Sequence, residues 1–242
     1  MYIVISSGFL IGGIAIATAD CILLHSVQCF LCVKNLGRYS MVTSLRERRR
    51  LQTGRDIQMA AVTVALRNGL DNTTTEAIAT EAGISTRTFF NYYNNKHAAI
   101  LGDAVRIDLI GAGWFAGSQN PVIDDLAHLL GQAAHDHPLD RALLLKILEV
   151  IEAHPALQEM FRTRLDETTV LVTEMLNARL GDDMAVEARL LASLATQALT
   201  EAVMTWVADD SLGLDAITTL IATRLRSVTQ ILMQSDTHAG PL

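Results

Sequence analysis

Apolar residues recur along one side of a helix in the segment 53–68. They are spaced three and four positions apart, which is the repeat of an α-helix with one buried face. Gly69 follows this pattern directly, and glycine readily adopts the left-handed backbone that ends a helix. The pattern therefore predicts a helix over 53–68. Its buried stripe would contain Ile57, Ala60, Ala61, Val64 and Ala65.

Two short helices, joined by a tight turn, are predicted next. The first needs a threonine N-cap, and Thr73, with Glu76 at capping-box spacing, competes with Thr74 for that position. The turn 83–85 contains a glycine, and the Ser85 hydroxyl can cap a second helix over 86–93. Two short helices around such a turn are typical of a helix-turn-helix.

The second of these helices is aromatic. Phe89 and Tyr93 are assigned to the core, whereas Phe90 suits either the core or a contact surface. Asn95 can cap a further helix that opens with Lys96.

The rest of the chain reads as one helix after another, with no strand pattern. Helices are predicted over 98–115, 121–136, from Pro138 to about 151, and over 155–180, 185–208 and 214–233, with proline or glycine at several of their ends. The fold class is therefore all-α: an N-terminal three-helix helix-turn-helix domain and a C-terminal antiparallel helical bundle. The buried face of 185–208 is assigned to Leu190, Leu191, Leu194, Ala198 and Val203.

The first forty residues differ from the rest. The segment 3–24 is apolar and long enough to span a membrane, but no basic residue precedes it as in a signal peptide. Met41 stands before a polar, arginine-rich stretch and is a natural start for a cytoplasmic protein. Residues 1–40 are therefore interpreted as an extension that is not translated or is disordered, with a membrane anchor through 3–24 as the alternative.

Cysteine and charge are unevenly distributed. All three cysteines precede residue 33, which excludes a disulfide framework for the main body, and the Cys29–Cys32 pair lacks a second ligand pair. Residues 41–100 hold eight Lys or Arg against five Asp or Glu, although the whole chain has a net charge of −7. A basic segment on an acidic body suits a DNA reader with a separate regulatory domain.

Residues 55–101 resemble the tetracycline-repressor-like (TetR) family of bacterial regulators. The likeness departs from the family where Ala65 and Leu70 replace frequent aromatic residues and where Asn94-Asn95 replaces Pro-Ser. The matching positions are Ile57, Ala60-Ala61, Gly69, Thr73-Thr74, Ile78-Ala79, Ala82-Gly83-Ile84-Ser85 and Thr88-Phe89-Phe90-Asn91-Tyr92-Tyr93-Asn94-Asn95-Lys96.

In a helix-turn-helix the N-terminal residues of the second helix meet base edges in the major groove. Here these are Thr86 and Arg87, with Ser85 at the cap, and Asn91 could reach an adenine or a phosphate. The resemblance implies that the remaining DNA contacts are phosphate contacts by Thr74, Tyr92 and Lys96. The arginine run at 46–50 could follow a groove or the backbone.

The resemblance also implies what the C-terminal body does. Its last two helices, 185–208 and 214–233, would pair with those of a second copy in a four-helix bundle. A pocket for a small effector would lie between the DNA-binding domain and that bundle. The residues proposed to line it are Trp114, Phe115, Met160, Phe161, Met175 and Trp206.

The chain contains no nucleophile with a histidine and an acid placed to activate it, no HExxH motif and no phosphate-binding glycine loop. An enzyme is therefore not predicted, and neither is a cofactor or a metal site. His128 and His135 share one helix face and are assigned to the surface. The prediction is a cytoplasmic, ligand-responsive repressor that binds a palindromic double-stranded DNA operator as a homodimer, with a DNA-binding domain at 41–97 and an effector and dimerisation domain at 98–236. The alternative is a membrane-tethered sensor anchored through 3–24.

Overall fold

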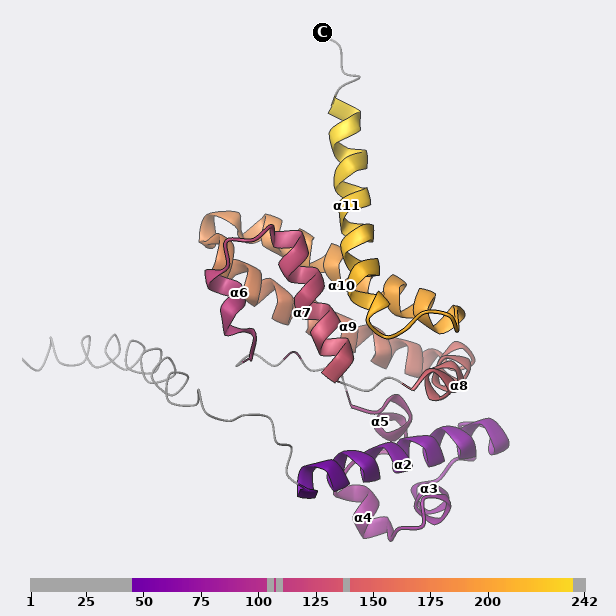
Figure 1. Cartoon of the computed structure of the whole chain (residues 1–242). Helices are drawn as coiled ribbons and strands as arrows, with labels where there is room; N and C mark the ends of the chain where they lie inside the picture. Colours follow the sequence, from indigo (N-terminus) through magenta and orange to yellow (C-terminus); the bar gives the residue numbers. More distant parts are fainter. Residues whose placement is uncertain (1–44, 104–106, 108–110, 137–139, 237–242) are drawn as a thin grey trace, which may run out of the picture. The chain divides into compact units, whose positions relative to one another are not determined.

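The computed structural model describes residues 45–103, 107, 111–136 and 140–236, so the predictions for residues 1–40 lie outside the described residues. Every regular element in the described ranges is a helix (Figure 1), and the fold is all-α as predicted. The head, residues 45–101, contains α2 (Leu45–Asn68), α3 (Thr75–Glu81), α4 (Thr86–Phe90) and α5 (Lys96–Leu101). The body, residues 111–236, contains η1 (Gly111–Gly113), α6 (Trp114–Gly117), α7 (Val122–Asp136), α8 (Arg141–Glu152), α9 (Pro155–Leu180), η2 (Asp182–Met184), α10 (Ala185–Ala208) and α11 (Ala216–Asp236).

The first helix of the head is longer than predicted. It begins at Leu45, eight residues before the predicted start, and ends at Asn68 as predicted. Residues 45–52 are leucine, arginine, glutamate and glutamine, which are all strong helix formers. They carry no apolar stripe, so hydrophobic periodicity could not reveal them.

The helix-turn-helix uses one of the two candidate caps for its first helix and the predicted cap for its second, which is shorter than predicted. Thr74 is the N-cap of α3, because its Oγ1 accepts a hydrogen bond from the Ala77 amide at 3.1 Å. The buried Thr73 instead donates its hydroxyl hydrogen to the Gly69 carbonyl at 2.8 Å. The prediction that the next helix reaches residue 93 is wrong. α4 ends at Phe90, where the Asn91 and Tyr92 amides bond carbonyls only three residues back.

The core of the head forms where the predicted apolar stripes meet. Ile57, Val64, Ile78, Phe89 and Ile100 are completely buried in one cluster. The same cluster includes apolar residues from two helices of the body, so the head does not have a separate core. These residues are Leu143, Ile147, Val150 and Ile151 of α8 and Leu157 of α9.

The prediction of a helix over 98–115 is wrong. α5 ends at Leu101, and Gly102 follows with φ of +70° while its amide donates to the Ala98 carbonyl at 3.0 Å. A residue with a side chain rarely takes this backbone, so the glycine fixes the end of the helix.

The helix ends predicted from glycine and proline in the body are confirmed for the long helix α9. α9 and α10 have the predicted bounds, and Gly181 ends α9 with φ of +87°. α8 is capped by Asp140, whose Oδ1 accepts from the Leu143 amide at 2.9 Å, while the predicted start at Pro138 lies outside the described residues. α11 is shifted by two to three residues from its predicted range.

The predicted buried face of α10 is wrong at Leu190 and Leu194, whereas Ala198 is buried and Leu191 and Val203 pack partly against the body core. Leu190 and Leu194 are 60% and 44% exposed, and the face that packs in the body is built mainly of alanine. Small residues allow helices to pack closely, so alanine occupies the crowded side and leucine the outer side. The buried apolar residues are Ala188, Ala192, Ala195, Ala198, Leu199, Ala202, Trp206 and Val207.

Apolar residues on both faces give α10 an unusual overall composition. The stretch Asp182–Ala208 is the one candidate among the described residues that is long and apolar enough to cross a membrane. About half of its apolar window (44%) is buried inside the body. Because its inner face already belongs to the body core, this composition is that of a core helix with a second apolar face.

Candidate nucleic-acid interface

The turn before α4 is organised by a glycine and a serine. Gly83 has φ of +68°, and its amide donates to the Thr80 carbonyl at 3.1 Å. Ser85 Oγ accepts from the Thr88 amide at 3.0 Å and lies 2.8 Å from Thr88 Oγ1. The cap fixes where α4 begins, and it therefore fixes which side chains stand at its N-terminus.

The side chains predicted to meet bases lie at this end of α4. Arg87 is exposed and Thr86 is half-buried, directly after the cap. Asn91 is exposed just after the last turn. Phe89 is completely buried, whereas the adjacent Phe90 is 51% exposed and meets it edge to face at 5.3 Å. One side of α4 thus anchors the helix, and the other side is accessible.

Thr74 stands at the N-terminus of α3, where backbone amides point outward. The first turn of α3 also contains Glu76. Hydrogen bonds from its own backbone amide and from the Thr75 and Thr74 hydroxyls outweigh a small effect of burial and lower the pKa of Glu76. A carboxylate therefore stands in the first turn of α3. A phosphate contact at Thr74 stays a prediction and would have to coexist with this charge.

The end of the helix-turn-helix is fastened to α2 by two tyrosines. The Tyr93 hydroxyl donates to the Gly54 carbonyl at 3.2 Å, and Tyr93 is buried. Burial and the nearby charge of Asp103 raise the pKa of Tyr93 to about 12. Tyr92 is half-buried, and a methyl group placed on Gly54 would lie 3.8 Å from its Cδ1. Tyr92 therefore lies beside α2 at Gly54.

Lys96, predicted to hold a phosphate, contacts the chain itself. Its Nζ donates to the Leu70 carbonyl at 2.7 Å and lies 3.4 Å from the Asp71 carbonyl oxygen. This contact ties the first residue of α5 to the loop before α3. A phosphate contact by Lys96 stays a prediction, and it would share the ammonium with these carbonyls.

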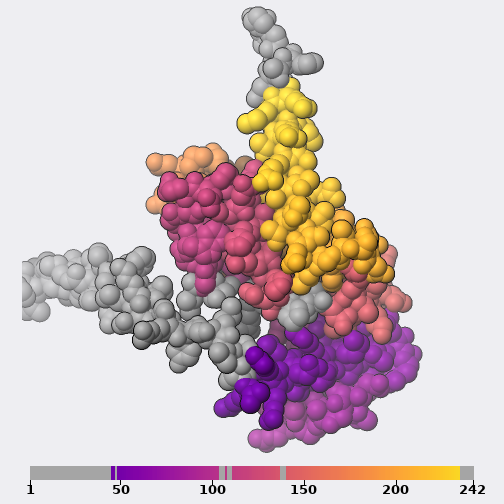
Figure 2. Space-filling view, in the orientation of Figure 1, coloured from indigo at the N-terminus to yellow at the C-terminus, as the bar shows by residue number. Residues whose placement is uncertain are grey.

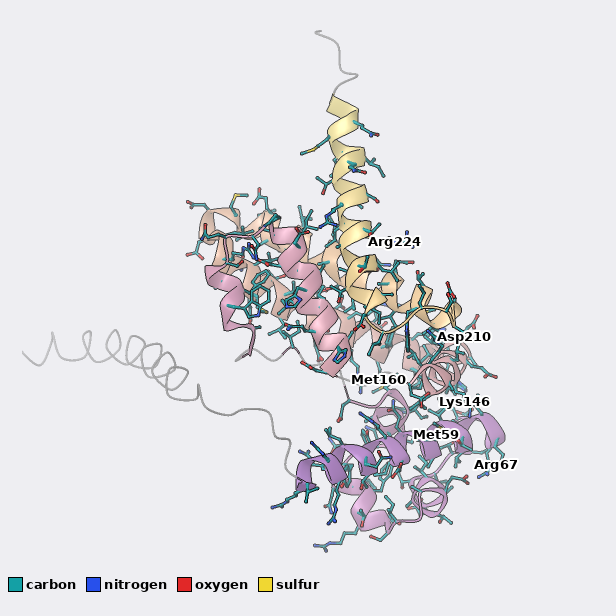
Figure 3. All side chains as sticks on the ribbon, viewed as in Figure 1. Met59, Arg67, Lys146, Met160, Asp210 and Arg224 are labelled. Atoms are coloured by element: carbon teal, nitrogen blue, oxygen red, sulfur yellow. The ribbon has the colours of Figure 1, made fainter. Side chains whose placement is uncertain are left out.

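The six residues predicted to line an effector pocket are not brought together. Met160 and Phe161 pack against the cluster that the head shares with α8 and α9, while Met175 packs against the other core cluster, which lies in the body. Phe115 and Trp206 are buried in the body, where they lie against Arg179 and Arg141 at 4.9 and 4.4 Å. The labelled Met160 can be found in Figure 3. Of the six, Trp114 lines the cleft along α7, and the other five do not line that cleft.

That cleft has a volume of about 690 Å³ and lies along α7. The ring of Trp114 packs beside the ring of His128, with 5.5 Å between their centroids. The sequence singles out Trp114 and His128 but not the other lining side chains, because only packing brings these residues together. The remaining lining residues are Gly111, Asn120, Pro121, Asp124, Asp125 and Gln132.

Asp125, which lines the cleft, belongs to a buried ion pair. Arg179 of α9 donates to Asp125 Oδ2 at 2.6 Å and to the Asn120 carbonyl at 2.6 Å. Burial alone would raise the pKa of Asp125, but hydrogen bonds from Ser118, Arg179 and Asn120 outweigh it and lower the pKa. Asp124 pairs with Arg226 of α11. Both carboxylates are therefore already neutralised by arginines.

In the described ranges no three or more His, Cys, Asp or Glu side chains are grouped so that they could hold a metal ion.

Comparison with known proteins gives one sequence match. Residues 57–100 match the family model described as "Bacterial regulatory proteins, tetR family". The matched segment runs from the middle of α2 to α5 and contains the whole helix-turn-helix. None of the curated proteins matches the chain.

Solved structures also match the chain, among them these three. A TetR-like transcriptional regulator from Rhodococcus sp. RHA1 is 21% identical, with 73% of this chain and 96% of that chain covered and a TM-score of 0.41. NalD of Pseudomonas aeruginosa, the secondary repressor of the MexAB-OprM multidrug efflux pump, is 18% identical, with 72% and 96% covered and a TM-score of 0.44. The fatty acid degradation regulator FadR of Bacillus halodurans is 23% identical, with 70% and 95% covered and a TM-score of 0.35.

Proposed function

Since this chain is a DNA-binding transcriptional regulator of the tetR family, we propose that it is a ligand-responsive repressor in the cytoplasm that binds a palindromic operator as a homodimer. The family consists of regulators rather than enzymes, in agreement with the sequence prediction. The observation that carries the proposal is the Ser85-capped N-terminus of α4, with Arg87 exposed beside it.

Arg87 suits base reading because a guanidinium can donate two hydrogen bonds to guanine O6 and N7. Thr86, next to the cap, is small enough to approach a base edge or a thymine methyl group. The buried Phe89 and Tyr93 hold α4 from behind, so these side chains are presented on a rigid support.

Dimerisation is supported by the apolar side chains that a single chain leaves exposed on its last two helices. Val186, Leu190 and Leu194 follow one another at four-residue spacing on α10, with exposed fractions of 58%, 60% and 44%. α11 adds Ile231, Leu232 and Met233, and its last turns extend beyond the helices that it packs against (Figures 1 and 2). Contiguous exposed apolar residues mark a protein interface. A twofold dimer would space two α4 helices by about 34–36 Å, one turn of DNA.

The effector site is proposed at the cleft along α7. It joins an aromatic pair, the half-buried Trp114 and the exposed His128, to polar groups such as Asn120 and Gln132. Such a mixture of flat apolar and hydrogen-bonding surface is usual for small-molecule sites. The other five predicted contacts, which do not line it, stay predictions: Phe115, Met160, Phe161, Met175 and Trp206.

The variant Arg87→Ala tests the proposal. It should weaken binding to an operator selected from random DNA by about 1–3 kcal/mol for each half-site, since the guanine contact is lost. Binding to DNA of scrambled sequence should change much less. The control Arg162→Ala removes an exposed arginine from α9 and should leave both affinities unchanged. Equal losses on operator and scrambled DNA would contradict base reading by Arg87.

A further inference from the structure

The end of α5, the last helix of the head, is held by side chains from two different helices. Gln58 of α2 donates its side-chain amide to the Ile100 carbonyl at 3.2 Å. Arg164 of α9 donates from its guanidinium to the Leu101 carbonyl at 3.0 Å. The last carbonyls of a helix have no partner within it, so these two bonds decide how α5 is held. One of them comes from the head and the other from the body.

The turn after α5 fits closely around these two side chains. Gly102 has φ of +70°, and a methyl group at this position would overlap the side-chain amide of Gln58. Burial lowers the pKa of Arg164, and the charges of Asp103 and Glu167 oppose that effect. Arg164 is therefore held by a hydrogen bond and by opposite charges at the point where the chain leaves the head.

A second arginine of α9 reaches the cleft along α7. Arg179 donates to Asp125 and to the Asn120 carbonyl, and both side chains of the ion pair are buried. Arg164 and Arg179 are fifteen residues apart, which is about 22 Å along the helix, and their side chains leave it about 60° apart. A ligand that competes for the hydrogen bonds of Asp125 would therefore disturb the same helix that holds the end of α5.

The helix between these two arginines has no residue that favours a kink. Residues 156–180 contain neither proline nor glycine. α9 also takes part in both core clusters, with Leu157 in the cluster that includes the head and with Val172 and Leu176 in the body cluster. A displacement at the cleft is therefore carried along α9 instead of being absorbed within it.

We propose that α9 couples the cleft along α7 to the DNA-binding head, with Arg179 as its contact at the cleft and Arg164 as the residue that positions the head. This inference rests on the proposed function and deepens it, because it states how the effector site regulates DNA binding. A ligand that perturbs the Asp125–Arg179 pair shifts α9, and Arg164 then moves the end of α5. In a dimer this movement changes the distance between the two copies of α4.

The first test measures affinity for the selected operator and for operators whose half-sites are one base pair closer or farther apart. Arg164→Met should reduce the preference of the wild type for the selected spacing by roughly fivefold or more, because the head is no longer fixed to α9. Affinity for DNA with a single half-site should not change, since α4 and its cap are untouched. An equal loss on every DNA would indicate a merely structural role and would overturn the inference.

Two other variants accompany this test. Arg162→Met removes an exposed arginine from the same helix and should leave the spacing preference unchanged. The shorter Arg164→Gln carries the same expectation as Arg164→Met if thermal unfolding shows that the methionine variant does not fold.

A double-mutant cycle tests the coupling along α9. Asp125→Asn removes the charge that pairs with Arg179 and should alter the spacing preference of the wild type severalfold, but not that of Arg164→Met. Distant sites without shared partners normally act additively, so this non-additivity would come from α9. Asn120→Ala, which removes only the 3.2 Å hydrogen bond to Asp125 Oδ1, is the milder alternative.

Strictly additive effects in the cycle would overturn the coupling, and so would an unchanged spacing preference in the Arg164→Met protein. A wild type that binds all spacings equally would instead overturn the proposed binding of a palindrome by a dimer, so the two failures are distinct.

Discussion

The Tyr93 hydroxyl joins the end of the helix-turn-helix to α2 through one hydrogen bond to the Gly54 carbonyl. Burial and the charge of Asp103 favour the neutral phenol, with the Arg164 charge opposing them, and raise its pKa to about 12. In the unfolded chain the same group ionises near pH 10. The native state therefore keeps this proton at a pH where the unfolded state has lost it.

This difference predicts a loss of stability at alkaline pH. The contribution of Tyr93 is fully present below pH 10 and disappears as the pH rises from about 10 to about 12. Tyr93→Phe should cost about 1 kcal/mol at pH 8, because the hydrogen bond is lost. Its difference in free energy of unfolding from the wild type, measured with urea, should shrink at pH 10.5 and above. A difference that stays constant with pH would contradict this account.

At the scale of helices, the close crossing of α7 and α11 depends on Gly131. A methyl group at this position would overlap Thr218 Oγ1, and it would lie 2.9 Å from Thr218 Cβ and 3.2 Å from its Cα. The backbone of α11 cannot yield as the end of a long side chain can, so the two helices approach closely only because residue 131 has no side chain.

Gly131→Ala should therefore destabilise the protein by about 1–3 kcal/mol, although alanine is the better helix former. Adding Thr218→Ala removes the nearest atom and should recover part of the loss. Gly117→Ala is the control, since no atom lies within 4 Å of the added methyl group. Thermal unfolding measures all three variants, and a Gly131→Ala protein as stable as the control would show that the helices are not so tightly packed.

The sequence predicted several of the helix ends that carry a cap, a proline or a glycine, whereas the start of α2 and the ends of α4 and α5 were missed. Pro155, Gly181 and the caps Ser85 and Asn95 act through local chemistry, so their effects can be read from the sequence. The cap of α3 could be narrowed only to Thr73 or Thr74. The prediction for the buried face of α10 was wrong at Leu190 and Leu194 because both sides of this helix are apolar. Hydrophobic periodicity cannot distinguish the side that packs in the body core from a second apolar side that is exposed.

Some residues of the candidate site could likewise be predicted from the sequence, and others could not. Ser85, Thr86 and Arg87 could be placed from the sequence because they follow a turn of fixed length. The cleft along α7 could not be predicted, because Asn120 and Gln132 meet the Trp114 ring only after the helices pack. The contact of Lys96 with the Leu70 carbonyl likewise joins two segments that are distant in the sequence.

For the whole molecule, the head and the body share one apolar cluster, in which α8 and α9 pack against the helices that carry the DNA-reading residues. Arg164 of α9 also donates to the Leu101 carbonyl at the end of α5, at 3.0 Å. A change in the body that moves α9 would therefore act directly on the support of α4. Together with the exposed leucines of α10, this arrangement suits a dimer whose body sets the spacing of two heads.

The central claim is that two copies of α4 read the two halves of one palindromic site. Its most direct test is a selection of binding sequences from random double-stranded DNA with the full-length protein, followed by affinity measurements across salt concentrations. The account predicts an enriched inverted repeat whose half-sites are about one helical turn apart, bound with a steep dependence on salt. Binding that enriches no sequence, or that enriches a single unrepeated half-site, would contradict it.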